Sequence, residues 1–148
     1  GIEKSKYASE LVNYQLLAVD YFYEKDEFDK RKKSFTELMK WQKAAELNDT
    51  ELLHLAKILC FQDQFSSAIE LLKARIVSDE VREELLLYFI QIAQYDKEKV
   101  SEKDFLKALQ KAQNLYPKQF CQLFTTCKMG KQSLKNSAVK TLYCSSCN

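Results

Sequence analysis

The chain has 148 residues, of which only two are glycine and one is proline, and 46% of them are hydrophobic. This length supports one domain with a hydrophobic core, and a composition so poor in turn formers predicts an all-α fold. The formal net charge of +2 gives no general argument for binding to nucleic acid or to a membrane surface. No apolar run reaches the roughly 18 residues that a membrane span needs. We therefore expect a single all-α domain over residues 1–148.

Apolar residues at helical spacing predict a first helix over residues 6–24. Its expected core stripe recurs at intervals of three and four residues and comprises Leu11, Tyr14, Leu17, Ala18, Tyr21 and Phe22. Residues 25–33 are expected to form a solvated turn, in which the basic run Lys30–Lys33 is balanced by the acids before it. The segment Ser34-Phe35-Thr36-Glu37 has the form of a capping box and predicts a second helix that ends near Leu47.

Four more helices are predicted downstream, each after a polar cluster that could cap its N-terminus. These clusters begin at Asn48, Ser67, Ser78 and Ser101. The apolar stripes that follow them are Leu52, Leu55, Ala56 and Leu59; Ala68, Leu72 and Ile76; Leu85, Phe89, Ile92 and Ala93; and Phe105, Leu109, Ala112 and Leu115. Pro117 is expected to end the last of these helices.

Two of these stripes share a pattern that belongs to a known class of helical repeats. Tyr14-x2-Leu17-Ala18-x2-Tyr21 resembles the first helix of a tetratricopeptide repeat, and Leu52-x2-Leu55-Ala56-x2-Leu59 fits the same template. Ala112 with Pro117 five residues later resembles the end of such a repeat. The resemblance covers about residues 8–117 and implies three antiparallel helix pairs stacked as a short solenoid. An ordinary helical bundle is the alternative.

The resemblance also implies a function. Tetratricopeptide-like repeats are expected to form a non-catalytic interaction or scaffold module, with a concave surface for a peptide or a helix of a partner protein. Asn13, Gln15 and His54 are the candidate groove residues. His54 is the only histidine, and neither a nucleophile motif nor a glycine-rich phosphate loop accompanies it. We therefore expect no catalytic residues, and the chain is not expected to be an enzyme.

The C-terminal segment 118–148 is predicted to be a separate cap, because it combines five lysines and no acid with four of the five cysteines. Those cysteines are Cys121, Cys127, Cys144 and Cys147. On a continuous helix, Cys121 and Cys127 lie about 9 Å apart along the axis, too far for a disulfide. Each is therefore expected to pair with Cys144 or Cys147.

Other chemistry at these four cysteines remains open. They could hold a structural zinc ion as four thiolates, in a basic module that binds nucleic acid through its tail. Alternatively, Cys144 and Cys147 could form the dithiol of a thiol-disulfide oxidoreductase, or the thiols could simply be free. No other cofactor is expected, and Cys60 is predicted to be a small core residue.

The cysteines also bear on the compartment. The sequence begins with Gly1 rather than Met, so we expect that a signal peptide has been removed. Clustered cysteines without good zinc spacing favour an oxidising, extracytoplasmic location, with the cytoplasm as the alternative.

Overall fold

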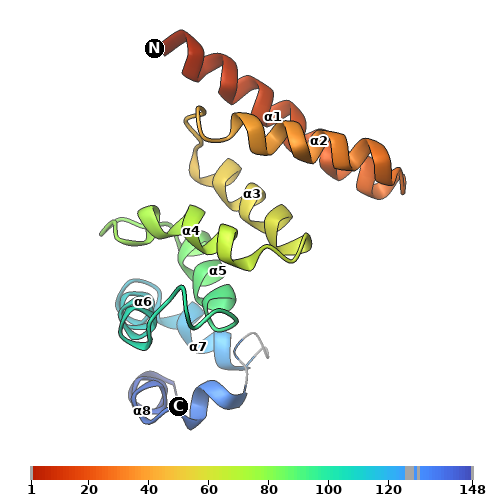
Figure 1. Ribbon diagram of the computed structural model, residues 1–148. Coiled ribbons are helices and arrows are strands. Elements are labelled where there is room, and N and C mark those ends of the chain that lie inside the picture. Colours follow the sequence, from red (N-terminus) through yellow and green to blue (C-terminus); the bar gives the residue numbers. More distant parts are fainter. Residues whose placement is uncertain (1, 126–128, 130, 148) are drawn as a thin grey trace. The chain divides into compact units, whose positions relative to one another are not determined.

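The computed structural model describes residues 2–125, 129 and 131–147, and this part of the chain is built of helices and turns without a strand (Figure 1). The all-α prediction is thus confirmed. The elements, in chain order, are α1 (Ile2–Glu24), α2 (Phe28–Trp41), α3 (Asp49–Phe61), α4 (Phe65–Ile76), α5 (Glu83–Ala93), α6 (Glu102–Leu115), α7 (Pro117–Thr125), the 3₁₀ helix η1 (Lys131–Lys135) and α8 (Ser137–Ser146).

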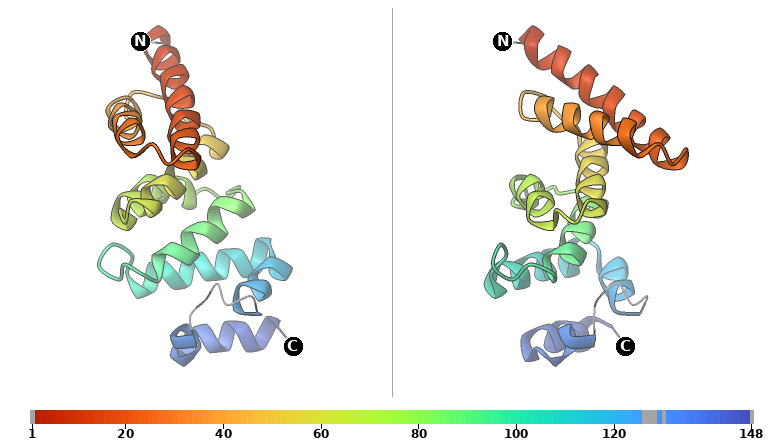
Figure 2. Two further views of the ribbon diagram at one scale, coloured as in Figure 1. Left: turned by 90° about the vertical axis from the view of Figure 1, so that its right-hand side faces the viewer. Right: turned by 45° about the vertical axis from the view of Figure 1, so that its right-hand side comes forward.

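The helices form two compact units, Gly1–Leu55 and Ala56–Asn148. In the first unit, α1 packs along α2, and the two helices lie side by side in both views of Figure 2. In the second unit, α5 packs against α4 and α6, while α6 also contacts α7 and α8. Packing is therefore mainly between neighbours in the sequence. The single-domain organisation stays a prediction.

The register of α1 differs from the prediction. Its buried stripe is Ala8, Val12, Leu16 and Val19, whereas Tyr14, Leu17 and Tyr21 are 67%, 69% and 54% exposed. Because α1 carries apolar residues around most of its circumference, its periodicity permits more than one buried face. The face that packs is rich in small and β-branched residues, which let helices approach closely. Tyrosine tolerates the exposed position because its hydroxyl remains hydrated.

The connection between α1 and α2 is shorter than predicted. Asp26 adopts a left-handed backbone conformation, with φ at 56°, and α2 begins at Phe28. The prediction of a turn over residues 25–33 was therefore wrong, and the segment 34–37 lies inside α2 rather than capping it. Lysine and arginine are good helix formers, so the basic run extends the helix on its solvent side.

Two of the predicted N-caps are present in the structure. The Asn48 side-chain oxygen accepts from the Glu51 backbone N–H at 2.8 Å, and the Glu51 carboxylate accepts from the Asn48 N–H at 2.9 Å. These reciprocal bonds start α3 as a capping box. Ser101 Oγ similarly accepts from the Asp104 N–H at 3.1 Å at the start of α6.

The caps predicted at Ser67 and Ser78 were wrong. Helix α4 starts earlier, after Gln64, and α5 starts later, after Arg82. Neither Gln64 nor Arg82 makes a side-chain cap hydrogen bond. The turn before α4 is instead made by the backbone of Asp63, whose φ is 59°. Pro117 both ends α6 and begins α7, as expected of a residue without an N–H at the first helical position.

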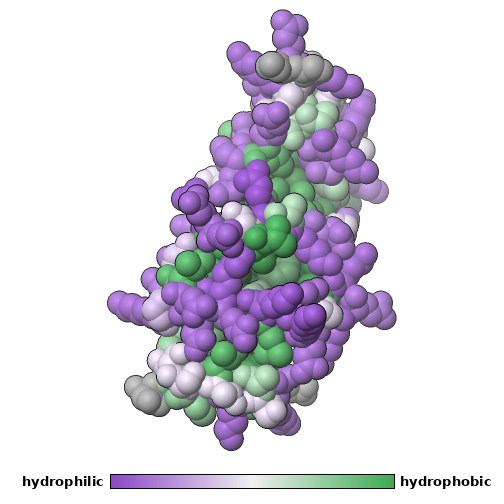
Figure 3. Space-filling model, turned by 90° about the vertical axis from the view of Figure 1, so that its left-hand side faces the viewer, coloured by the Kyte–Doolittle hydropathy of each residue, from purple (hydrophilic) through white to green (hydrophobic). Residues whose placement is uncertain are grey.

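The cores of the later helices largely match their predicted stripes. Every predicted stripe residue of α3, α4 and α5 is buried, as are Leu109 and Ala112 of α6. Phe105 is half-buried, however, and Leu115 is exposed. On the face drawn in Figure 3, hydrophobic residues also reach the surface at several places among hydrophilic ones. None of the described helices combines the length and apolar character needed to cross a bilayer.

Side chains of α6, and of Tyr116 directly after it, hold segments on both sides of this helix in the sequence. Lys111 Nζ donates to the carbonyl oxygens of Ile76 at 2.7 Å and Ser78 at 3.0 Å, where α4 ends. Tyr116 donates its hydroxyl hydrogen to the Val81 carbonyl at 2.8 Å. Gln113 donates from Nε2 to the Leu142 carbonyl at 3.3 Å, near the end of α8. Helix α6 thus anchors both the α4–α5 connection and the C-terminal helix.

Candidate functional site

The exposed side of α1 carries large side chains in a row. Tyr14, Leu17 and Tyr21 are separated by three and four residues, which places them on one helical face. We call this face, with Glu10, Asn13, Asp20 and Glu24 beside it, the outer face of α1. Side chains of this size are uncommon in a row on a surface, and contiguous exposed apolar groups often mark interaction sites. The sequence pattern identified the three residues but assigned them to the core.

The outer face of α1 is acidic. Glu10, Asp20 and Glu24 are all exposed, and the sequence from Tyr7 to Glu24 contains no lysine or arginine. Lys25 follows at the end of the helix, where its ammonium lies 5.8 Å from the centre of the Tyr21 ring. The apolar row is therefore flanked mainly by carboxylates.

Two of the three candidate groove residues are associated with the outer face of α1. Asn13 is exposed on it. His54, on α3, places Nε2 2.7 Å from Oδ2 of Asp20, two helical turns beyond Asn13 on the same side of α1. Gln15 is half-buried and lies on another side of the helix, where its Oε1 is buried without a hydrogen-bond partner among the described residues. The structure thus brings Asn13 and His54 to one edge and leaves Gln15 apart.

An aromatic pair at the end of the α1–α2 hairpin was not predicted from the sequence. The Arg31 guanidinium lies 5.3 Å from the Tyr23 ring centre and 5.0 Å from that of Phe28. Phe28 is 62% exposed even so. The only signal in the sequence was that Phe28 lies just before the basic run Lys30–Lys33. The contact of Arg31 with both rings depends on the start of α2 at Phe28, which the sequence did not predict.

A disulfide joins the C-terminal helices. Cys121 on α7 is bonded to Cys147, which follows α8, with an S–S distance of 2.04 Å and a Cα separation of 5.5 Å. This confirms the expected link between Cys121 and the terminal pair. Cys144 is an exposed free thiol, so it is not joined to Cys147. Cys127 lies outside the described residues.

The disulfide also affects the metal alternative. Zinc binds thiolates, and the sulfurs of Cys121 and Cys147 are not thiolates while they are bonded to each other. Elsewhere in the described part of the chain, no three His, Cys, Asp or Glu side chains are grouped as a metal site would require. Holding zinc at the four cysteines would therefore require reduction of this bond.

Cys60 is half-buried beside Tyr88 rather than fully enclosed in the core. Burial raises the pKa of the Cys60 thiol, and a hydrogen bond with Tyr88 partly offsets this increase. The same burial and the bond to Cys60 raise the pKa of the Tyr88 hydroxyl. Both groups are thus held in their protonated forms, which does not suit a nucleophile.

No family model, characterised protein or solved structure matches this chain. The resemblance to tetratricopeptide repeats therefore stays a prediction.

Proposed function

We propose that this chain is a non-catalytic protein-interaction module that binds a basic amphipathic helix or peptide on the outer face of α1. The observation that carries this proposal is the exposed row of Tyr14, Leu17 and Tyr21. Tyrosine is enriched at protein interfaces, where its ring buries a large area and its hydroxyl can hydrogen-bond. The spacing of three and four residues suits contact with a partner helix.

Charge selects the class of partner. Glu10, Asp20 and Glu24 surround the row, so cationic side chains beside an apolar stripe complement it, whereas an acidic partner would be repelled. The resemblance to tetratricopeptide repeats supports the same class of function, although it places the binding surface in a concave groove. We also propose an oxidising, extracytoplasmic compartment, with which the Cys121–Cys147 disulfide is compatible.

The first test uses two synthetic amphipathic helices of equal length, one of leucine and lysine and the other of leucine and glutamate. Titration of the full chain should show binding of the lysine peptide that weakens as salt increases, because the attraction is screened. The Leu17→Asp variant should weaken this binding at least about tenfold, since it places a charge in the centre of the apolar contact. Leu17 is exposed, so stability should change by only about 0.5 kcal/mol.

The matched control is Val77→Asp, which introduces the same charge at an exposed apolar residue outside α1. It should leave peptide binding unchanged. Equal binding of the glutamate peptide, or equal losses in Leu17→Asp and Val77→Asp, would overturn the proposal. So would concentration-dependent self-association that Leu17→Asp removes, because the face would then bind a second copy.

A further inference from the structure

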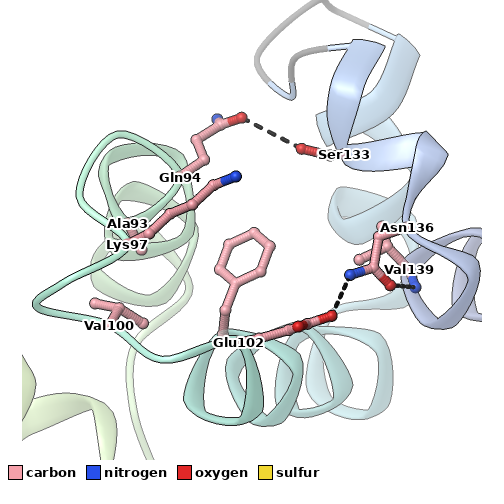
Figure 4. A pocket seen from close by; sticks show the side chains of 9 residues that line it. Ala93, Gln94, Lys97, Val100, Glu102, Ser133, Asn136 and Val139 are labelled. Atoms are coloured by element: carbon pink, nitrogen blue, oxygen red, sulfur yellow. Dashed lines mark hydrogen bonds between the residues drawn. The ribbon is translucent and has the colours of Figure 1, made fainter.

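A pocket of about 480 Å³ lies within the second unit, apart from the outer face of α1. One wall is the end of α5 and the connection to α6, and the opposite wall is η1 with the start of α8 (Figure 4). This volume is within the range of pockets that bind small organic molecules.

Part of the lining is apolar. Ala93, Val100 and Val139 are almost completely buried around the pocket, and half-buried Phe105 also lines it. A ligand in this pocket would therefore place an apolar group against these side chains, because their contact with water is unfavourable.

The polar lining includes one group of each charge. Lys97 extends from the α5–α6 connection into the space between the walls (Figure 4). None of the ion pairs in the described part of the chain involves Lys97. Glu102, at the start of α6, accepts a hydrogen bond from Asn136 Nδ2 across the pocket. A carboxylate has several lone pairs, so it can accept further bonds from a ligand.

The start of α8 does not compete with Lys97 for an anion. Asn136 Oδ1 accepts from the backbone N–H groups of Ala138 at 2.9 Å and Val139 at 3.3 Å, which occupies donors that an anion would otherwise use. Lys97 is therefore the cationic group available to a ligand, and Glu102 is the anionic one.

From this arrangement we propose that the pocket binds a small zwitterion with an apolar side chain, of the size of an amino acid or a dipeptide. Lys97 pairs with the ligand carboxylate, Glu102 accepts from the ligand ammonium, and the side chain packs against Phe105 and Val139. A ligand with only one charge would satisfy only one of the two groups. The site is independent of the interaction proposed for α1.

The test is a titration of the full chain monitored by NMR. The four probes are L-phenylalanine, L-phenylalanyl-L-leucine, phenylacetate and phenethylamine. A zwitterion should shift the amide signals of residues 93–105 and 133–139. Each single-charge analogue should bind about tenfold more weakly or worse, because it loses one charge-assisted hydrogen bond. The preferred zwitterion then distinguishes a free amino acid from a peptide.

Two variants assign the charges. Lys97→Met should weaken the binding of L-phenylalanine about tenfold and leave the binding of phenethylamine unchanged. Glu102→Gln should also weaken the binding of L-phenylalanine about tenfold, but it should leave the binding of phenylacetate unchanged. Lys118→Met and Glu98→Gln are matched controls at exposed positions outside the pocket lining. Lys97 is exposed, so its variant should fold even if Glu102→Gln does not.

Several results would overturn the proposal. These are zwitterions that bind no more tightly than both single-charge analogues, a Lys97→Met variant that behaves like Lys118→Met, and the absence of shifts in both segments with every probe. Because Leu17→Asp lies in the other unit, it should leave this titration unchanged.

Discussion

At the scale of single residues, Cys60 and Cys144 provide a contrast between two free thiols. Cys144 is exposed on α8, whereas Cys60 is half-buried and its pKa is raised by that burial. Only the thiolate is nucleophilic, so the raised pKa leaves less of Cys60 in reactive form at a given pH. Cys60 should therefore be a poor nucleophile although part of it reaches solvent.

This contrast predicts that iodoacetamide at pH 8 alkylates Cys144 several-fold faster than Cys60. The experiment is peptide mass spectrometry over time, in a Cys127→Ser background that removes the remaining thiol. Tyr88→Phe should slow Cys60 further, because it removes the hydrogen bond that lowers its pKa. Equal labelling rates at the two sites would contradict the assigned environment.

The raised pKa also has a consequence for stability. The unfolded Cys60 ionises at a lower pH than the folded one, so its contribution to folding is complete below the unfolded pKa and is lost as the pH rises through the folded pKa. The Tyr88 partner could not be predicted from the sequence, because it lies 28 residues away on a different helix.

At the scale of elements, the capping box at the start of α3 allows a direct test. Asn48→Ala removes the side-chain acceptor for the Glu51 N–H and should reduce the free energy of unfolding by about 1 kcal/mol. Urea denaturation followed by circular dichroism measures the change. Asn114→Ala, at an exposed position within α6, should not destabilise, because alanine is the better helix former there. A similar loss in both variants would refute the capping role.

Helix starts could be predicted only where a side chain makes the cap. Asn48 and Ser101 do so, and both clusters were identified in the sequence. Before α2 and α4, the chain is turned instead by an aspartate with positive φ. Because most aspartates do not adopt this conformation, an aspartate in the sequence does not by itself predict a helix start. The serines at positions 67 and 78 therefore resembled caps that the structure does not use.

The register of α1 was unpredictable for another reason. Its apolar residues surround most of the helix, and only packing against α2 decides which of them are buried. The choice of buried face depends on how the surfaces of both helices fit together, and the apolar pattern of one helix does not show this. The same ambiguity explains why the candidate interaction surface was taken for core.

At the scale of the whole molecule, the Cys121–Cys147 bond closes a loop with a sequence separation of 26 residues. In a chain-entropy model, such a loop contributes about 3.5 kcal/mol to the stability of the folded state. Cys121→Ser should therefore speed hydrogen exchange in α7 and α8, as measured by mass spectrometry. Helices α1 and α2, which belong to the other unit, should keep their exchange rates.

The control for this prediction is Cys144→Ser, which removes the free thiol on α8 without breaking the Cys121–Cys147 bond. Its exchange rates should match those of the unchanged chain. A variant lacking Cys121 that exchanges no faster in α8 would show that packing alone holds this helix. Faster exchange throughout α1 and α2 would contradict the division into two units.

The fold class and the buried stripes of α3, α4 and α5 could be predicted because helical periodicity is a local property. Features formed by distant segments could be predicted less fully. The link between Cys121 and the terminal pair was expected, but the choice of Cys147 over Cys144 depends on how α8 packs on α7. The pocket between Lys97 and Asn136 could not be predicted from the sequence, because its walls come from segments about 40 residues apart.

The anchoring of the α4–α5 connection by α6 has a consequence for how this chain can vary. Lys111 and Tyr116 bind carbonyl oxygens of Ile76, Ser78 and Val81, and every amino acid supplies such an oxygen. These bonds depend on the path of the connection and not on its side chains. Substitutions at exposed positions 77–80 should therefore be tolerated, while positions 111 and 116 bear the selective constraint for the whole turn.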